Sequence, residues 1–161
     1  MKIQCPRSHL VLASCAVLLG VCSAGGQSLY VTSSATDSVL EFDANTGAYL
    51  DTLIAPASGI DEPRSVRVGP DGKLYVADLN GDRVVRCDLP NGAATGSFVT
   101  AGSGGLDGPW AIEWSTGVIY VTHAAASGSV LKYSSTTGAF LGTFATGTGV
   151  PQGLLASAAG H

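Results

Sequence analysis

The chain has 161 residues, of which 45% are hydrophobic and only 12% are charged, and its 8 basic and 12 acidic residues give a formal net charge of −4. Lys and Arg form no cluster, which disfavours nucleic acid and anionic lipid as partners, because both are bound through clustered positive charge. Three of the four cysteines lie within the first 24 residues, and only Cys87 follows them. A small domain held together by disulfides is therefore excluded.

Residues 1–24 have the three parts of a secretory signal peptide. Lys2 and Arg7 precede an apolar run over 10–21, and small residues follow the run up to Ala24. The run is shorter than the stretch of about 20 apolar residues that spans a membrane. The pattern predicts cleavage after Ala24, no membrane anchor, and a secreted or periplasmic protein. Residues 25–161 would then hold 12 acidic and 6 basic residues, a net charge of −6.

A second interpretation of this segment uses residues 12–15, Leu-Ala-Ser-Cys, which resemble a bacterial lipoprotein box. Cleavage there would leave a lipidated Cys15. The apolar run continues past this cysteine to Leu19. That continuation favours the secretory signal.

The rest of the chain is a repeat. One phrase recurs every 45 residues, as Leu29-Tyr30-Val31, Leu74-Tyr75-Val76 and Ile119-Tyr120-Val121. Self-similarity at this spacing indicates units that cannot bury their apolar faces alone and that stack on their neighbours.

The second unit, over 63–100, shows its elements most clearly. Turn residues over 69–72, Gly-Pro-Asp-Gly, predict a tight hairpin between two antiparallel strands. Apolar and polar residues alternate on both sides of it, as in strands with one face in a core. The predicted strands of this unit are 63–68, 73–77, 84–88 and 97–100.

The other units repeat the pattern. The third, over 109–144, predicts strands at 109–113, 118–122, 130–133 and 139–144, and the first, over 29–54, predicts strands at 29–32, 39–42 and 48–54. The first unit thus lacks a leading strand. At the other end, residues 151–155 match the leading strands and predict the start of a further unit.

Four short antiparallel strands in each repeat of about 45 residues are typical of the blades of a β-propeller. The sequence therefore predicts an all-β chain, a partial propeller of about three blades within residues 25–161. The second unit also resembles the NHL family of propellers, through Pro63-Arg64-Ser65-Val66, through the run from Asp71 to Asp78, and through Asn80 and Arg83-Val84. The other units resemble it more loosely, since Ser33 and His123 replace Asp78.

Three blades do not close a ring, because propellers typically have about 4 to 8. Two interpretations stay open. Two chains can join in a six-bladed ring, in which the strand over 151–155 completes the first unit of the neighbour. Alternatively, the chain is a fragment of a longer propeller. The second is favoured, because a missing strand at one end and an extra strand at the other is also what an arbitrary cut produces.

The resemblance implies that one end of the repeats binds ligands. In propellers, the loops between second and third strands open on the same face as the segments that enter the next blade. Here these are the loops 33–38, 78–83 and 123–129 and the entry segments 59–64, 104–110 and 149–152. Arg64, Trp110 and Gln152 each follow an entry proline, so we expect them to surround the channel mouth as a mixed recognition surface. The alternative explanation is that these three residues differ in type because an exposed position tolerates random substitution.

His123 is the next candidate, since it takes the position of Asp78 one unit later. NHL-like lyases, acting on peptidyl-hydroxyglycine or streptogramin substrates, use His and Glu residues around a divalent metal. None of the glutamates at 41, 62 and 113 pairs with a histidine in a motif. A zinc site also usually has three protein ligands. The residues therefore favour a surface histidine and no cofactor.

The loop Asp78-Leu79-Asn80-Gly81-Asp82 has the alternating oxygens of a calcium loop but lacks the later bidentate glutamate. Stabilisation of the turn explains it better. Asp43 and Asp88 are expected to cap turns in a similar way. Cys87 is expected to be an inert core thiol.

Together these features favour an exported, non-enzymatic binding scaffold for a protein, peptide or glycan ligand, contacted by Arg64, Trp110 and Gln152 with Asp78, Asp107 and His123. The alternative is a metal-assisted lyase or lactonase of the six-bladed type, with His123, Asp78 and Asp107 in its site. Self-association that completes the ring is a further expectation.

Overall fold

The computed structural model describes residues 26–124 and 128–157, and the predicted signal peptide lies outside them. These residues form three antiparallel sheets joined by turns and three short 3-10 segments. The first sheet contains β1 (Ser28–Ser33), β2 (Ser38–Asp43) and β3 (Tyr49–Ile54). The middle sheet contains β4 (Pro63–Val68), β5 (Leu74–Asp78), β6 (Arg83–Cys87) and β7 (Ala94–Val99). The third sheet contains β8 (Pro109–Ser115), β9 (Val118–His123), β10 (Ser129–Ser134) and β11 (Phe140–Thr146).

The strands predicted between residues 29 and 144 are confirmed, with bounds shifted by at most three residues. In each sheet, neighbouring strands along the chain pair with each other, so every connection is a hairpin or a short loop. The prediction of a strand at 151–155 is wrong: residues 151–157 have no regular secondary structure and pair with no strand. The leading strands β4 and β8 each pair with the strand that follows them, β5 and β9, and no strand follows residues 151–157 in the described part of the chain.

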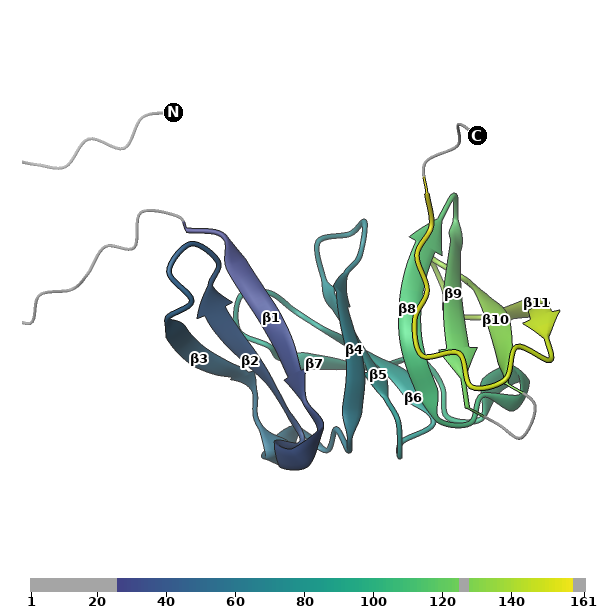
Figure 1. Cartoon of the computed structure of the whole chain (residues 1–161), viewed down its shortest axis with the longest axis horizontal. Coiled ribbons are helices and arrows are strands. Elements are labelled where there is room, and N and C mark those ends of the chain that lie inside the picture. The colour runs from purple at the N-terminus through teal and green to yellow at the C-terminus, as the bar shows by residue number, and fades with distance from the viewer. Residues whose placement is uncertain (1–25, 125–127, 158–161) are drawn as a thin grey trace, which may run out of the picture.

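The three sheets lie side by side in chain order, with β4 between β1 and β8 (Figure 1). The segment that follows β11, drawn in yellow, turns back and runs beside β8 (Figure 1). Among the described residues, no helix has the length and apolar character that a membrane crossing requires.

Two apolar layers hold the sheets together. The layer between the first and middle sheets contains Val39, Leu53, Ile54, Ile60, Leu74, Val76, Val85 and Cys87. The layer between the middle and third sheets contains Tyr75, Ala77, Val84, Val99, Leu106, Ile112, Ile119, Val121, Leu131 and Tyr133. Alternate residues of β5 enter the two layers, so all five of its residues are buried. The middle sheet is therefore covered on both faces, and the outer sheets on one each.

A turn that recurs in all three sheets joins the last two strands. The N–H of its glycine donates to the carbonyl four residues earlier, at 2.8 Å for Gly47 and Gly92 and at 2.9 Å for Gly138. In the first copy, Asp43 accepts hydrogen bonds from the N–H groups of Asn45 and Thr46, which confirms the predicted cap. The bonds from Thr46 lower the pKa of Asp43 below its usual value. Asp88 instead pairs its carboxylate with Lys73.

Two of these turn glycines also set how closely the sheets approach. A Cβ atom on Gly92 would lie 2.0 Å from the Leu53 carbonyl oxygen, and one on Gly138 would lie 1.8 Å from that of Phe98. The backbones of the middle and third sheets therefore each touch the last strand of the sheet before them. No larger residue fits there without moving the sheets apart.

Cys87 lies in the layer between the first and middle sheets and is buried, as expected for a core thiol. Burial raises its pKa to about 11, with a smaller contribution from the charge of Asp88. The thiolate, which is the reactive form, is therefore scarce at neutral pH.

Candidate functional site

The leading strands of the middle and third sheets bring two of the predicted residues together. Arg64 follows Pro63 at the start of β4, and Trp110 follows Pro109 at the start of β8. The Arg64 guanidinium carbon lies 4.4 Å from the centroid of the Trp110 ring. A guanidinium over an indole face is a favourable cation–π contact. Glu62 holds Arg64 in place through an ion pair.

Beside this pair lies a hollow of about 430 Å³. It lies where the loop between β5 and β6 meets the segment that enters β8, and both polar and apolar groups face it. Its lining residues are Leu79, Asn80, Asp82, Asp107, Gly108, Trp110 and Ala124. Two predicted residues, Asp107 and Trp110, thus share one surface, and Asp107 is exposed there.

A carboxylate fixes the two walls of this hollow relative to each other. Asp82 accepts a hydrogen bond from the backbone N–H of Gly108 at 2.8 Å. Asp82 has a left-handed backbone, with φ of 50°, which Asp tolerates better than most residues. Asn80 is fixed in turn, since its amide donates to Asp61 at 2.9 Å. The loop is therefore shaped before any ligand arrives.

Asp78 lies under this loop rather than in the hollow. It has no exposed surface, and its carboxylate accepts from the Asp61 N–H at 2.9 Å and from Arg83 Nε at 2.6 Å. Arg83 also donates to the Gly59 carbonyl at 2.7 Å. Asp78 thus ties its loop to the entry of β4, a longer-range role than the local turn stabilisation that was predicted, and it does not line the hollow.

His123 is buried, with 6% of its surface exposed, so the expectation of a surface histidine is wrong. It ends β9, where it pairs in register with both Pro109 and Ser129. Its Nε2 hydrogen-bonds the Ser129 hydroxyl. His123 therefore lies in the sheet between the starts of β8 and β10, next to the strand that carries Trp110.

Gln152 is exposed on the segment after β11. It makes no hydrogen bond with the described residues, and it does not line the hollow beside Trp110. The predicted grouping of Arg64, Trp110 and Gln152 is thus found for the first two. The predicted loop 123–129 includes 125–127, which lie outside the described residues.

Three of the predicted residues carry a buried nitrogen atom that has no hydrogen-bond partner in the described part of the chain. These atoms are Arg64 Nε, Trp110 Nε1 and His123 Nδ1. A buried donor without a partner costs about 1–3 kcal/mol, so such groups mark places where a ligand or water would be favourable. Two of the three belong to the stacked Arg64–Trp110 pair.

Leu79, Asn80 and Asp82 line the hollow. They fall in the loop 78–83 that was expected on the ligand-binding face, but none of them was singled out as a ligand contact. The polar run that contains them was visible in the sequence and indicated a stabilised turn. In the structure the carboxylates of this run accept from other segments, Asp78 from the Asp61 N–H and Asp82 from the Gly108 N–H, while Asn80 and Asp82 line the hollow.

The described residues contain no group of three His, Cys, Asp or Glu side chains that could hold a metal ion. Neither a family model nor a curated protein matches the chain.

Proposed function

We propose that this chain is part of an exported β-propeller of the NHL type that acts as a non-enzymatic binding scaffold. Support for the propeller comes from three stacked sheets whose contacts recur every 45 or 46 residues, including the two carboxylate bonds Asp37–Glu62 and Asp82–Gly108, and from the NHL-like residues of the second unit. Support for export comes from the signal-like pattern over 1–24.

The proposed binding surface is the hollow beside the stacked Arg64–Trp110 pair. One observation carries this proposal: the buried indole N–H of Trp110 has no partner in the described chain and belongs to a residue that lines the hollow. Asp107 and Asn80 add exposed acceptor and amide groups on the same surface. An aromatic wall with a few fixed polar groups is the usual composition of a ligand site.

The ligand class follows from these groups. The indole N–H needs an acceptor, such as a carbonyl or hydroxyl oxygen, and the Asp107 carboxylate needs a donor. A peptide segment or a glycan presents both kinds of group side by side. We therefore propose a protein, peptide or glycan ligand bound at the hollow.

A lyase or lactonase at this surface gains no support from the positions of its candidate residues. Asp78 is buried, and its carboxylate accepts hydrogen bonds from Arg83 and from the Asp61 N–H. His123 is also buried, and its Nε2 hydrogen-bonds the Ser129 hydroxyl. Neither side chain lines the hollow that Asp107 faces.

The test uses the two tryptophans as a matched pair. Arrays of immobilised glycans and peptides would be probed with the whole chain and with Trp110→Phe, which keeps an aromatic ring under Arg64 but removes the N–H. Trp114→Phe is the control, because Trp114 Nε1 is also buried without a partner yet lies outside the hollow. We expect Trp110→Phe to weaken binding about tenfold, and Trp114→Phe to leave it unchanged in folded protein. Equal effects of the two variants would contradict the site.

A further inference from the structure

On the side away from the middle sheet, the first sheet has an apolar face that no other element of the described chain covers. We call it the leading face; its residues are Leu29, Val31, Leu40 and Phe42. Leu29 is 55% exposed and Val31 38%. Because side chains alternate along a strand, Tyr30 points the other way and packs against the layer shared with the middle sheet.

The same positions are buried in the other two sheets. Their equivalents in the middle sheet are Leu74, Val76, Val85 and Cys87, and those in the third sheet are Ile119, Val121, Leu131 and Tyr133. All eight side chains lie in layers that join one sheet to the sheet before it. The leading face therefore has the composition of a joining surface, without a sheet on it.

The third sheet has the complementary uncovered face. We call it the trailing face; it comprises Tyr120 and Phe144 together with the segment 151–157. Tyr120 packs edge-on against Phe144, with ring centroids 5.1 Å apart. The equivalent pair of the middle sheet, Tyr75 and Phe98, lies 5.0 Å apart and is covered by Trp114 from the third sheet, 4.9 Å from Tyr75.

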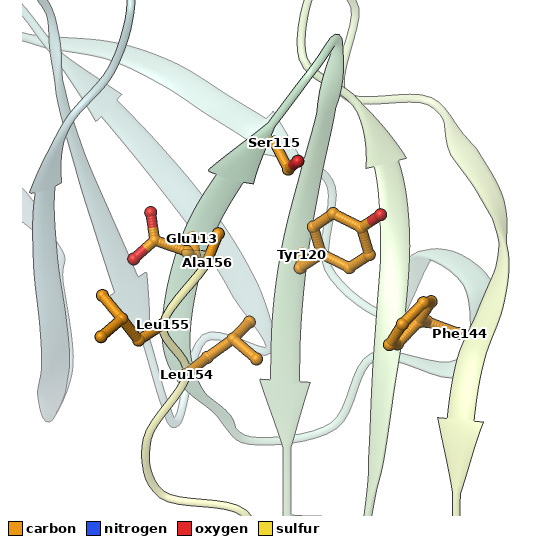
Figure 2. Close-up of a pocket in the computed structure, with 7 residues that line it drawn as sticks. All are labelled: Glu113, Ser115, Tyr120, Phe144, Leu154, Leu155 and Ala156. Atoms are coloured by element: carbon orange, nitrogen blue, oxygen red, sulfur yellow. The ribbon is translucent and has the colours of Figure 1, made fainter. Parts of the chain in front are cut away.

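A hollow of about 220 Å³ lies on the trailing face. Figure 2 shows Leu154, Leu155 and Ala156 crossing in front of β8, with Tyr120 and Phe144 on the strands beyond. When Pro151 is aligned with Pro109, Ala156 takes the position of Trp114. The segment runs beside β8, as β8 lies beside β4, and so it takes the place of the leading strand of a next sheet (Figure 1). It leaves Phe144 62% and Leu155 81% exposed.

The turn glycines show the same asymmetry. Gly92 and Gly138 are pressed against the carbonyl oxygens of Leu53 and Phe98 in the preceding sheets. Gly47, their equivalent on the first sheet, has open space around it: a Cβ atom added there would meet nothing within 4 Å, although the backbone is left-handed in the same way. Phe144 is the residue equivalent to Leu53 and Phe98. Gly47 at one end of the array and Phe144 at the other are thus the two partners of this contact, and within one chain they do not meet.

We propose that the trailing face of one copy of this chain docks onto the leading face of a second copy, and repeats the joint that the chain already makes twice within itself. The segment 151–157 of the first copy would pair with the free edge of β1 in the second, with Leu154 opposite Val31 as Ile112 is opposite Val121. Two copies would give six sheets, a number within the range of about 4 to 8 blades of closed propellers, and would use every joining face. That the assembly contains two copies rests on the propeller proposed above. That the trailing face docks onto the leading face does not depend on it.

The test measures mass in solution for the whole chain and for variants of each face. The unmodified chain should sediment as two copies. Leu29→Asp on the leading face and Phe144→Asp on the trailing face should each raise the dissociation constant at least about tenfold. In a homodimer of either variant, each of the two joints would bury one introduced carboxylate. Ser97→Asp, at an exposed position of β7, is the control and should change nothing.

Mixing the two face variants gives the decisive result. A mixture of Leu29→Asp and Phe144→Asp contains one intact joint, between the trailing face of the first and the leading face of the second, so it should form mixed dimers although neither variant does alone. Leu154→Pro, which removes a ladder N–H without adding charge, should behave like Phe144→Asp and serves if that variant does not fold. A single-copy mass for the unmodified chain, or no recovery on mixing two folded variants, would overturn the proposal and leave the faces to another partner.

Discussion

The Asp82 carboxylate accepts a hydrogen bond from the Gly108 backbone N–H at 2.8 Å, and this bond ties the middle sheet to the entry of the third. The joint before it repeats the arrangement, since Asp37 accepts from the Glu62 N–H at 2.9 Å. Both aspartates have a left-handed backbone and stand just before the third strand of their unit. Gly128 takes this position in the third unit, also with positive φ but without a carboxylate. The bond is thus a repeated device that sets how one sheet meets the next.

Asp82→Gly is expected to lower the free energy of unfolding by about 1–2 kcal/mol, because it keeps the left-handed backbone but removes the charged acceptor from the Gly108 N–H. Asp82→Asn is the matched control: its amide oxygen can still accept, so it should lose clearly less. Urea denaturation of both variants measures the difference. Equal stability of Asp82→Gly and the unmodified chain would mean that water replaces the carboxylate without cost.

The turn glycines give a second prediction, in which the same substitution is made at equivalent positions. Gly92→Ala should destabilise the fold by more than about 3 kcal/mol or prevent folding, because its Cβ would lie 2.0 Å from the Leu53 carbonyl oxygen. Gly47→Ala has the same backbone conformation and open space around it, so it should cost only about 1–2 kcal/mol of backbone strain. Thermal unfolding followed by circular dichroism compares the two. Similar losses would show that the sheets do not approach each other this closely.

The raised pKa of Cys87 predicts that the folded protein loses stability at alkaline pH. Its pKa is about 11 in the folded protein against 9.0 without burial, so the stability that the neutral thiol contributes is complete below pH 9 and falls as pH rises toward 11. By pH 10 the loss should reach about 1 kcal/mol. Burial also raises the pKa of Tyr75 and Tyr133 from the usual value of 10.0, so the stability that their neutral side chains contribute is lost only above about pH 10.

Denaturation curves between pH 8 and pH 10 would measure this effect, with Cys87→Ala as the comparison. The variant will be less stable overall, because it loses packing, but its stability should change less with pH over this range. An identical pH dependence in the two proteins would assign the alkaline loss to other groups.

The strands were predictable because their signals are local. Short stretches of chain are enough to show them: the alternation in Leu74-Tyr75-Val76, the turn before Lys73 and the recurrence of the same phrase. The segment 151–155 has the same local signals and forms no strand in the described structure, because pairing depends on a partner strand and not on the segment alone. Local pattern therefore predicts the capacity to form a strand, and the neighbours decide whether the strand forms.

The site was predictable only in part, for a related reason. Equal positions after the entry prolines predicted that Arg64 and Trp110 lie close together, and they do. The exposure of His123 was predicted wrongly, because a polar residue at a strand end gives no sign that β8 and β10 will flank it. Nor does the sequence distinguish Gly47 from Gly92, since only the stacking of sheets makes one open and the other crowded.

The most direct test of the binding surface uses the chain's two tryptophans, Trp110 and Trp114, whose indole N–H groups give separate nitrogen-15 signals. A glycan or peptide that binds in array screening would be titrated into the labelled chain. We expect the Trp110 signal to move as the ligand is added and the Trp114 signal to stay in place, because Trp110, unlike Trp114, lines the hollow with Asp82 and Asp107. A ligand that binds while the Trp110 signal stays in place would contradict it.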